Sequence, residues 1–213
     1  MTLLEPDVSL TDFGLALECG GFAVWLLWRC RTLLGFSFAA LFAAAGLGAL
    51  LGGIEHGFLA DNNSPLAQAV WTGTLIAIGI AALASWVVGA LLIMSRAGAL
   101  RVAKLAALLF VGYVAVILFV SQSFTVAIVY YLPAAAFLLI AFALAYRREQ
   151  AGFLLAGLAG MVLTFVAAAV QQIRINLHPI YFNYNALYHL IQAFAFVLLF
   201  LAARALVKPA RVG

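Results

Sequence analysis

The chain has 213 residues, of which 68% are hydrophobic and only 8% are charged, and its formal net charge is +4. This composition excludes a soluble domain, which could not leave so much apolar surface in water, and it indicates an integral membrane protein. The positive charge gives no reason to expect a nucleic-acid partner. Membrane lipid is the expected partner.

Apolar runs separated by short polar breaks cover almost the whole chain. A membrane-crossing helix needs roughly 20 predominantly apolar residues, and backbone groups in lipid must find their hydrogen bonds within the segment, as a helix does. The sequence therefore predicts an all-α fold, one bundle of seven transmembrane helices forming a single domain over residues 1–213. The predicted spans are 11–29, 33–60, 66–95, 102–120, 123–146, 151–173 and 182–206.

The basic residues predict the orientation of these spans. Lys and Arg gather on the cytoplasmic side of a membrane, and in this chain Arg174 stands alone on one side of the predicted bundle. The others share the opposite side: Arg29, Arg31, Arg96, Arg101, Lys104, Arg147, Arg148, Arg204, Lys208 and Arg211. We therefore expect the N-terminus outside and the C-terminus in the cytoplasm, with the protein in a plasma membrane, such as the bacterial inner membrane.

Polar side chains within the spans fall in the half of the bundle that this orientation places toward the outer leaflet. Glu55 and His56 lie about one turn from the outer end of span two, Gln171 ends span six, and Glu18 lies about two turns into span one. Charged groups in a span cost about 2.5–3.5 kcal/mol on insertion scales, so they usually pair or mark a site.

Span seven carries the densest group of polar residues. Asn185, His189 and Gln192 have the spacing i, i+4, i+7 and share one face of the predicted helix, and Tyr181 and Tyr188 flank that face. We predict that His56, Asn185 and His189 converge with Glu18 in one cavity that opens toward the outer leaflet. Each also has a structural alternative, such as a histidine that joins two helices by a hydrogen bond.

Small residues at a spacing of four recur in span two. Gly48 and Gly52 form one such pair, and Gly53 and Gly57 form a second. Such pairs let helix backbones approach closely in membranes. The sequence therefore predicts close packing along this face of span two.

Two short motifs carry a resemblance to a known superfamily. The seven-span layout, the stretch GGIEHG at the end of span two and the stretch NALYHLIQA at the start of span seven resemble the CREST superfamily of alkaline ceramidases and progestin and adipoQ receptors. They resemble most closely its small bacterial seven-span members. The resemblance implies a zinc-dependent membrane amidase in which His56 and His189 hold the metal. Asn185 stands where the family has the first histidine of its HxxxH pair, and Gly52 stands where it usually has a serine.

The resemblance and the polar residues together suggest a set of roles. Asn185 and Tyr181 would orient the substrate, and Gln171, Tyr188 and Gln192 would bind it. A third zinc ligand would come from Glu55, Glu18, His178 or Asp61, and Glu55 or Glu18 is also the candidate general base.

Two functions from different classes are compatible with this pattern. One is a membrane-embedded, metal-dependent hydrolase that cleaves a lipid-like amide or ester from the outer leaflet. The other is a non-catalytic, receptor-like protein that binds a lipid or a small amphiphile in the same polar cavity. A transporter is less compatible, because polar side chains are concentrated in one half of the spans.

Overall fold

The computed structural model describes residues 3–60, 64–178 and 181–207. Within these residues the chain is helical, and all seven of its long helices are long and apolar enough to cross a membrane, as predicted. Asp61, Lys208 and Arg211, which entered the sequence predictions, lie outside the described residues. The helices are α1 (Pro6–Arg29), α2 (Leu33–Ile54), α3 (Pro65–Ile93), α4 (Arg96–Phe119), α5 (Phe124–Glu149), α6 (Gly152–Gln172) and α7 (Tyr184–Leu206), and α2 continues into a π-helical turn, η1 (Glu55–Leu59).

Two helices begin earlier than predicted, and their first residues explain why. Helix α1 begins at Pro6 instead of residue 11, with a proline in its first turn, a position that suits proline because that N–H would be unpaired anyway. Helix α4 begins at Arg96 instead of residue 102, because the hydroxyl of Ser95 accepts a hydrogen bond from the backbone N–H of Gly98. Because the first turns of both helices are polar, hydropathy alone does not detect where the helices begin.

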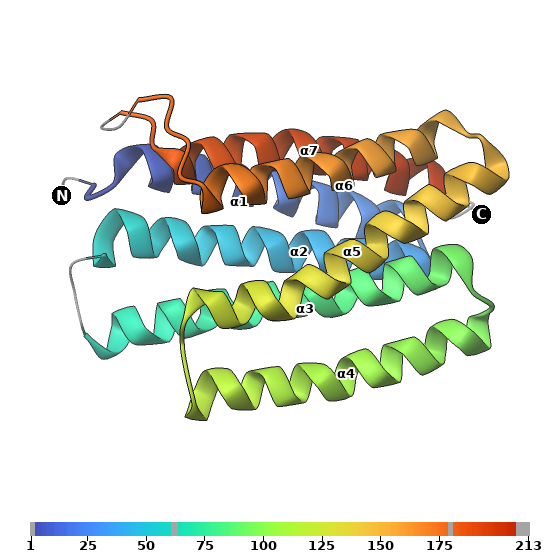
Figure 1. Cartoon of the computed structure of the whole chain (residues 1–213), viewed down its shortest axis with the longest axis horizontal. Helices are drawn as coiled ribbons and strands as arrows, with labels where there is room; N and C mark the ends of the chain where they lie inside the picture. Colours follow the sequence, from blue (N-terminus) through green and yellow to red (C-terminus); the bar gives the residue numbers. More distant parts are fainter. Residues whose placement is uncertain (1–2, 61–63, 179–180, 208–213) are drawn as a thin grey trace.

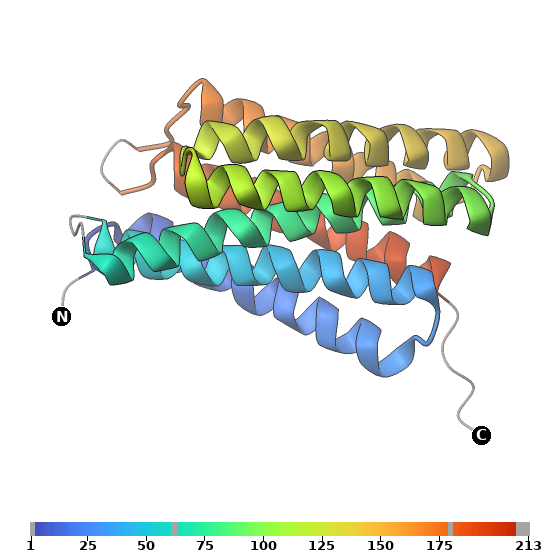
Figure 2. The same cartoon turned by 90° about the horizontal axis from the view of Figure 1, so that it is seen from below.

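Six of the helices close into a ring and one lies outside it. In the ring, α1 packs on α2, α2 on α3, α3 on α5, α5 on α6, α6 on α7, and α7 on α1. Helix α4 packs against α3 at the edge of the bundle (Figures 1 and 2). Figure 1 also shows that α5 and α6 meet at their shared loop and diverge toward the other end of the bundle.

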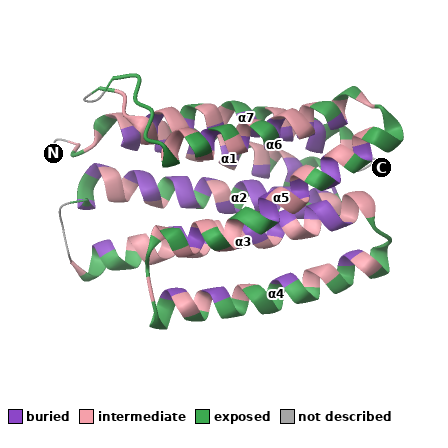
Figure 3. Ribbon diagram, viewed as in Figure 1, coloured by how far each residue is buried: buried purple, intermediate pink, exposed green. Residues whose placement is uncertain are grey.

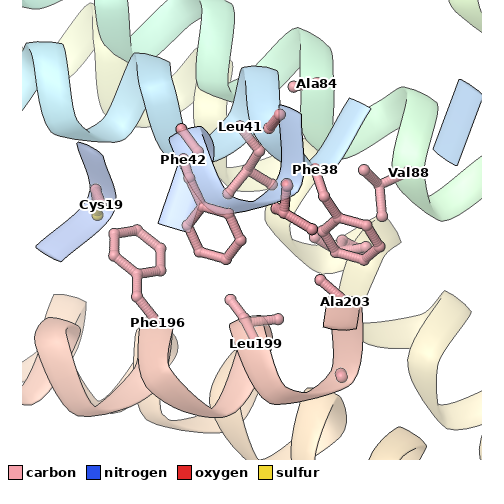
Figure 4. Packing of buried hydrophobic residues seen from close by; sticks show 14 of the residues in the cluster. Cys19, Phe38, Leu41, Phe42, Ala84, Val88, Phe196, Leu199 and Ala203 are labelled. Carbon is pink, nitrogen blue, oxygen red and sulfur yellow. The ribbon is translucent and has the colours of Figure 1, made fainter. Parts of the chain in front are cut away.

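Apolar packing fills the half of the ring near the C-terminus. Figure 3 shows buried residues on the inward faces of the helices, whereas the outer face of α4 is largely exposed. Phe22 of α1 stacks on Phe200 of α7 at 4.2 Å between ring centroids. Phe42 of α2 meets Phe196 of α7 edge-on at 5.8 Å between ring centroids (Figure 4). The core therefore closes this half of the ring and leaves the opposite half for polar groups.

Basic residues gather at the same end as this core. The helix order brings together the C-terminal ends of α1, α3, α5 and α7 with the N-terminal ends of α2, α4 and α6. Among the described residues, that end carries the predicted cytoplasmic Lys and Arg residues from Arg29 to Arg204, and Arg174 lies at the other end beyond α6. The charge asymmetry read from the sequence is therefore an asymmetry of the folded bundle.

Candidate functional site

A cavity of about 510 Å³ lies inside the ring, in the half away from the apolar core. All six ring helices contribute to its wall. Its lining includes exposed residues, Gln172 and Arg174 at the helix ends and Leu132 on α5. Toward the core the wall is apolar and includes Leu15, Leu41 and Phe196. Its polar lining consists of Asp12, His56, Thr74, Tyr131, Thr164, Gln171, Gln172, Arg174, Tyr184, Asn185, Tyr188, His189 and Gln192.

The centre of the polar wall is a pair formed by Asp12 of α1 and His189 of α7. Asp12 Oδ1 lies 3.2 Å from His189 Nε2, and the other ring nitrogen, Nδ1, lies 3.2 Å from the hydroxyl of Thr11. That hydroxyl donates to the backbone carbonyls of Asp7 and Val8 at 2.9 Å. The Thr11 oxygen therefore accepts a hydrogen bond from Nδ1–H of His189. The contact between His189 Nε2 and Asp12 Oδ1 then holds one proton, which the two atoms share.

Glycines of α2 make room for Asp12. A Cβ atom on Gly52 would lie 3.2 Å from Asp12 Oδ2, and one on Gly53 would lie 2.8 Å from the ring of Phe13. The carbonyl of Gly53 also accepts a hydrogen bond of 2.7 Å from the hydroxyl of Ser9. The predicted close packing is confirmed at Gly52, Gly53 and Gly57, whereas a Cβ on Gly48 would meet its nearest neighbour at an ordinary 3.7 Å. The close approach at Gly52 and Gly53 lets α1 place a carboxyl group inside the ring.

Two amide side chains of α7 connect it to α6. Gln171 Nε2 donates to Asn185 Oδ1 at 3.2 Å, and Gln192 Nε2 donates to Thr164 Oγ1 at 3.1 Å. The Thr164 hydroxyl itself donates to the carbonyl of Gly160 at 3.1 Å. Its oxygen must therefore accept from Gln192, and this fixes which end of the Gln192 amide carries the oxygen.

His56 is held by the segment that precedes α1. Its Nδ1 lies 2.9 Å from Glu5 Oε2, and its backbone carbonyl accepts from the N–H of Glu5 at 3.2 Å. The N–H of Leu4 donates to the carbonyl of Gly57 at 3.0 Å. Leu4 and Glu5, which precede α1, are thus hydrogen-bonded to η1, and His56 remains part of the cavity wall.

Two buried oxygen atoms of the site have no hydrogen-bond partner among the described residues. They are Asp12 Oδ2 and Gln192 Oε1, and each of these residues is only 3% exposed. Buried polar atoms are almost always hydrogen-bonded, to protein or to water, so unpaired ones in a native structure need an explanation. Both residues line the cavity, and a bound molecule could supply the missing partners.

Most of the residues predicted for the site line this cavity, and three do not. His56, Gln171, Asn185, Tyr188, His189 and Gln192 all belong to its wall. Glu18 is half-buried on α1 outside the lining, Glu55 in η1 also lies outside it, and Tyr181 is 76% exposed in the α6–α7 loop. His178, a suggested third ligand, lies in the same exposed loop, where its Nδ1 accepts from the backbone N–H of Tyr181.

Sequence reasoning missed Asp12, which occupies the place expected for Glu18. The missed signal lies in the helix start: with α1 beginning at Pro6, Ser9 and Asp12 fall on the same stripe as Leu15 and Cys19, and all four are buried. A polar residue on the buried stripe of an apolar helix points toward a partner inside the bundle. Glu18 lies off that stripe, one residue before Cys19.

The predicted zinc site needs a third ligand beside His56 and His189, and Asp61, one of the candidates, lies outside the described residues. A catalytic zinc takes three protein ligands and an open position, but the described part of the chain contains no group of three His, Cys, Asp or Glu side chains that could hold a metal ion. Of the two histidines that line the cavity, His189 has its ring nitrogens beside Asp12 and Thr11, and His56 has its Nδ1 beside Glu5. We therefore derive no chemistry through a metal.

Comparison with known proteins assigns the chain to a family. Its sequence matches the profile of DUF6962, a family of unknown function, over residues 8–208, and the chain belongs to this family. A search of the curated proteins and a search of the solved structures each gave no match. The match begins within the first turn of α1 and extends past the end of α7, so it includes every residue that lines the cavity.

Proposed function

We propose that this protein binds a lipid or another small amphiphilic molecule within the membrane, in the cavity enclosed by the helix ring. The observation that carries the proposal is the cavity itself, whose volume of about 510 Å³ is within the usual range for small-molecule sites. Its wall joins an apolar floor to a small group of buried polar side chains. Such a wall suits a molecule with a hydrocarbon part and a polar head group.

The charge asymmetry of the bundle supports an orientation for this site. The end that carries most of the Lys and Arg residues would face the cytoplasm, so the N-terminus and the cavity would face the outside, and the C-terminus would face the cytoplasm. The ligand would then be drawn from the outer leaflet of a plasma membrane, such as the bacterial inner membrane.

The proposal is tested by filling the cavity. Ala168 of α6 belongs to the cavity wall, whereas the neighbouring Ala169 is exposed and lies outside the lining. Amphiphiles that copurify with the parent protein should be lost from Ala168→Trp and retained by Ala169→Trp, as measured by extraction and mass spectrometry. A parent protein without any copurifying amphiphile, or equal retention by both variants, would contradict the proposal.

A second candidate function is metal-dependent hydrolysis of a lipid-like amide or ester. It is favoured by one observation: His56 and His189 line the same cavity, and a carboxyl group accompanies His189. The described side chains include no group of three that could hold a metal ion, so we assign no step to zinc.

Zinc content separates the two candidates. If the protein only binds an amphiphile, the parent should remain metal-free in zinc-replete medium. A hydrolase should instead contain stoichiometric zinc, which His56→Ala or His189→Ala should remove. Asn185→His restores the HxxxH pair. If this variant binds zinc and the parent protein does not, the result would count against the hydrolase.

A further inference from the structure

The chemistry of the two unpaired oxygen atoms specifies the head group that the cavity takes. This step rests on the proposed function, because it concerns the polar part of the amphiphile. We infer that the head group carries N–H or O–H donors, as an amine or an alcohol does, and that Asp12 Oδ2 and Gln192 Oε1 accept hydrogen bonds from it.

Asp12 Oδ2 is an acceptor whichever group holds the shared proton. If the proton lies on His189 Nε2, Asp12 is an ionised carboxylate and both of its oxygens accept. If the proton lies on Asp12 Oδ1, which faces His189 at 3.2 Å, then Oδ2 is a carbonyl-type oxygen and again accepts. The conclusion about Oδ2 therefore does not depend on the protonation of the pair.

Gln192 Oε1 is an acceptor because the amide orientation is fixed by its neighbour. The hydroxyl proton of Thr164 is used on the carbonyl of Gly160, so the Thr164 oxygen accepts from Gln192 Nε2. The Gln192 oxygen is thus directed away from Thr164, and it is buried without a partner among the described residues.

Both acceptors are carried by residues of the same cavity wall. Asp12 and Gln192 line the same cavity, and Gln192 follows His189 by three residues on α7, which places it about one turn deeper toward the apolar floor. Two buried acceptors on one cavity wall favour a ligand that donates hydrogen bonds and disfavour one that only accepts them. An ether or ester group has no proton to donate and would leave Asp12 Oδ2 and Gln192 Oε1 unpaired.

The test compares three probes that share one hydrocarbon chain and differ in the head group. They are 1-dodecylamine and 1-dodecanol, which donate hydrogen bonds, and dodecyl methyl ether, which only accepts. Each is titrated separately against the full-length protein in detergent, and bound probe is counted by native mass spectrometry. One or two hydrogen bonds to buried acceptors should make the amine or the alcohol bind about tenfold or more tightly than the ether.

Variants of Asp12 and Gln192 test whether these two side chains cause the preference for a donating head group. Asp12→Ala should lower the ratio of affinities. Gln192→Met keeps the size of the side chain, leaves the Asp12–His189 pair in place and should also lower the ratio, and the double variant should bring it close to one. Glu18→Gln is the matched control, because Glu18 is a carboxyl residue of the same helix outside the cavity lining, and it should leave the ratio unchanged.

The outcomes distinguish this inference from the proposed function. An amine that binds more tightly than the alcohol indicates an ammonium head group beside Asp12, and equal binding of the two indicates any donor; either supports the inference. If all three probes bind alike, as they would if water paired both oxygens, or if the preference survives both variants, the inference is wrong while amphiphile binding stands. If no probe binds, the proposed function itself fails.

Discussion

Asp12 of α1 and His189 of α7 meet at 3.2 Å between Oδ1 and Nε2, and both side chains are buried inside the helix ring. Burying a carboxyl group without a partner is costly, so each of these residues makes the other tolerable in the apolar bundle. The contact also closes the ring, because it joins the first helix to the last beside the cavity.

A double-mutant cycle should detect this pairing. Asp12→Leu and His189→Leu each remove one partner, and we expect a coupling energy of about 1–2 kcal/mol in the free energy of unfolding, toward the upper end of values measured within membranes. The same cycle with Glu18→Leu in place of Asp12→Leu is the control and should be additive within about 0.5 kcal/mol. Equal coupling in the two cycles would contradict the pairing.

Helix α6 should tolerate no side chain at Gly160. An added Cβ would lie 2.7 Å from the backbone carbonyl oxygen of Ala195 on α7, which cannot move aside as a side chain can. Gly160→Ala should therefore lower the free energy of unfolding by about 1–3 kcal/mol, as overpacked cores do.

The control for this prediction is Gly112→Ala on the peripheral helix α4, where an added Cβ meets nothing within 4 Å. It should be neutral or stabilising by up to about 1 kcal/mol, because alanine loses less backbone entropy than glycine in a helix. Unfolding of both variants in mixed micelles provides the measurement. Similar losses at the two glycines would show that the α6–α7 contact does not have this geometry.

The contact between Glu5 and His56 should contribute little to stability. The side chains are 40% and 28% exposed, and ion pairs that reach solvent contribute at most about 1 kcal/mol. Glu5→Gln should thus lower the free energy of unfolding by less than that, and the effect should shrink at high salt. A loss well above 1 kcal/mol that does not respond to salt would mean that the segment before α1 depends on this pair far more than its exposure implies.

Single cysteines should reveal the orientation of the bundle. Gln122→Cys lies in the exposed α4–α5 loop at the cavity end, and Ala97→Cys is exposed near the start of α4 at the basic end. A membrane-impermeant maleimide should label the first in intact cells and the second only after permeabilisation. The parent protein is the control, because Cys19 and Cys30 are both buried. Labelling of Ala97→Cys in intact cells would reverse the orientation.

The family resemblance predicted two histidines of the site, and the structure adds the carboxyl group of Asp12, which faces His189. His56 and His189 were identified from GGIEHG and NALYHLIQA, and both line the cavity. Glu18 was predicted because it lies about two turns into the first apolar run, and Asp12 was not among the predicted residues. Depth along a helix is readable from sequence, but the direction in which a side chain points depends on where the helix begins and on which neighbour it packs against.

The sequence by itself determined the class of fold. The described residues form seven helices that are long and apolar enough to cross a membrane, and this follows from composition and run length alone because a backbone in lipid has few other ways to satisfy its hydrogen bonds. Only the tertiary structure decided which polar residues meet. Hydrogen bonds such as Gln192 to Thr164 and the Asp12–His189 contact join distant parts of the chain, and they depend on the order of helices around the ring, which local hydrophobicity does not encode.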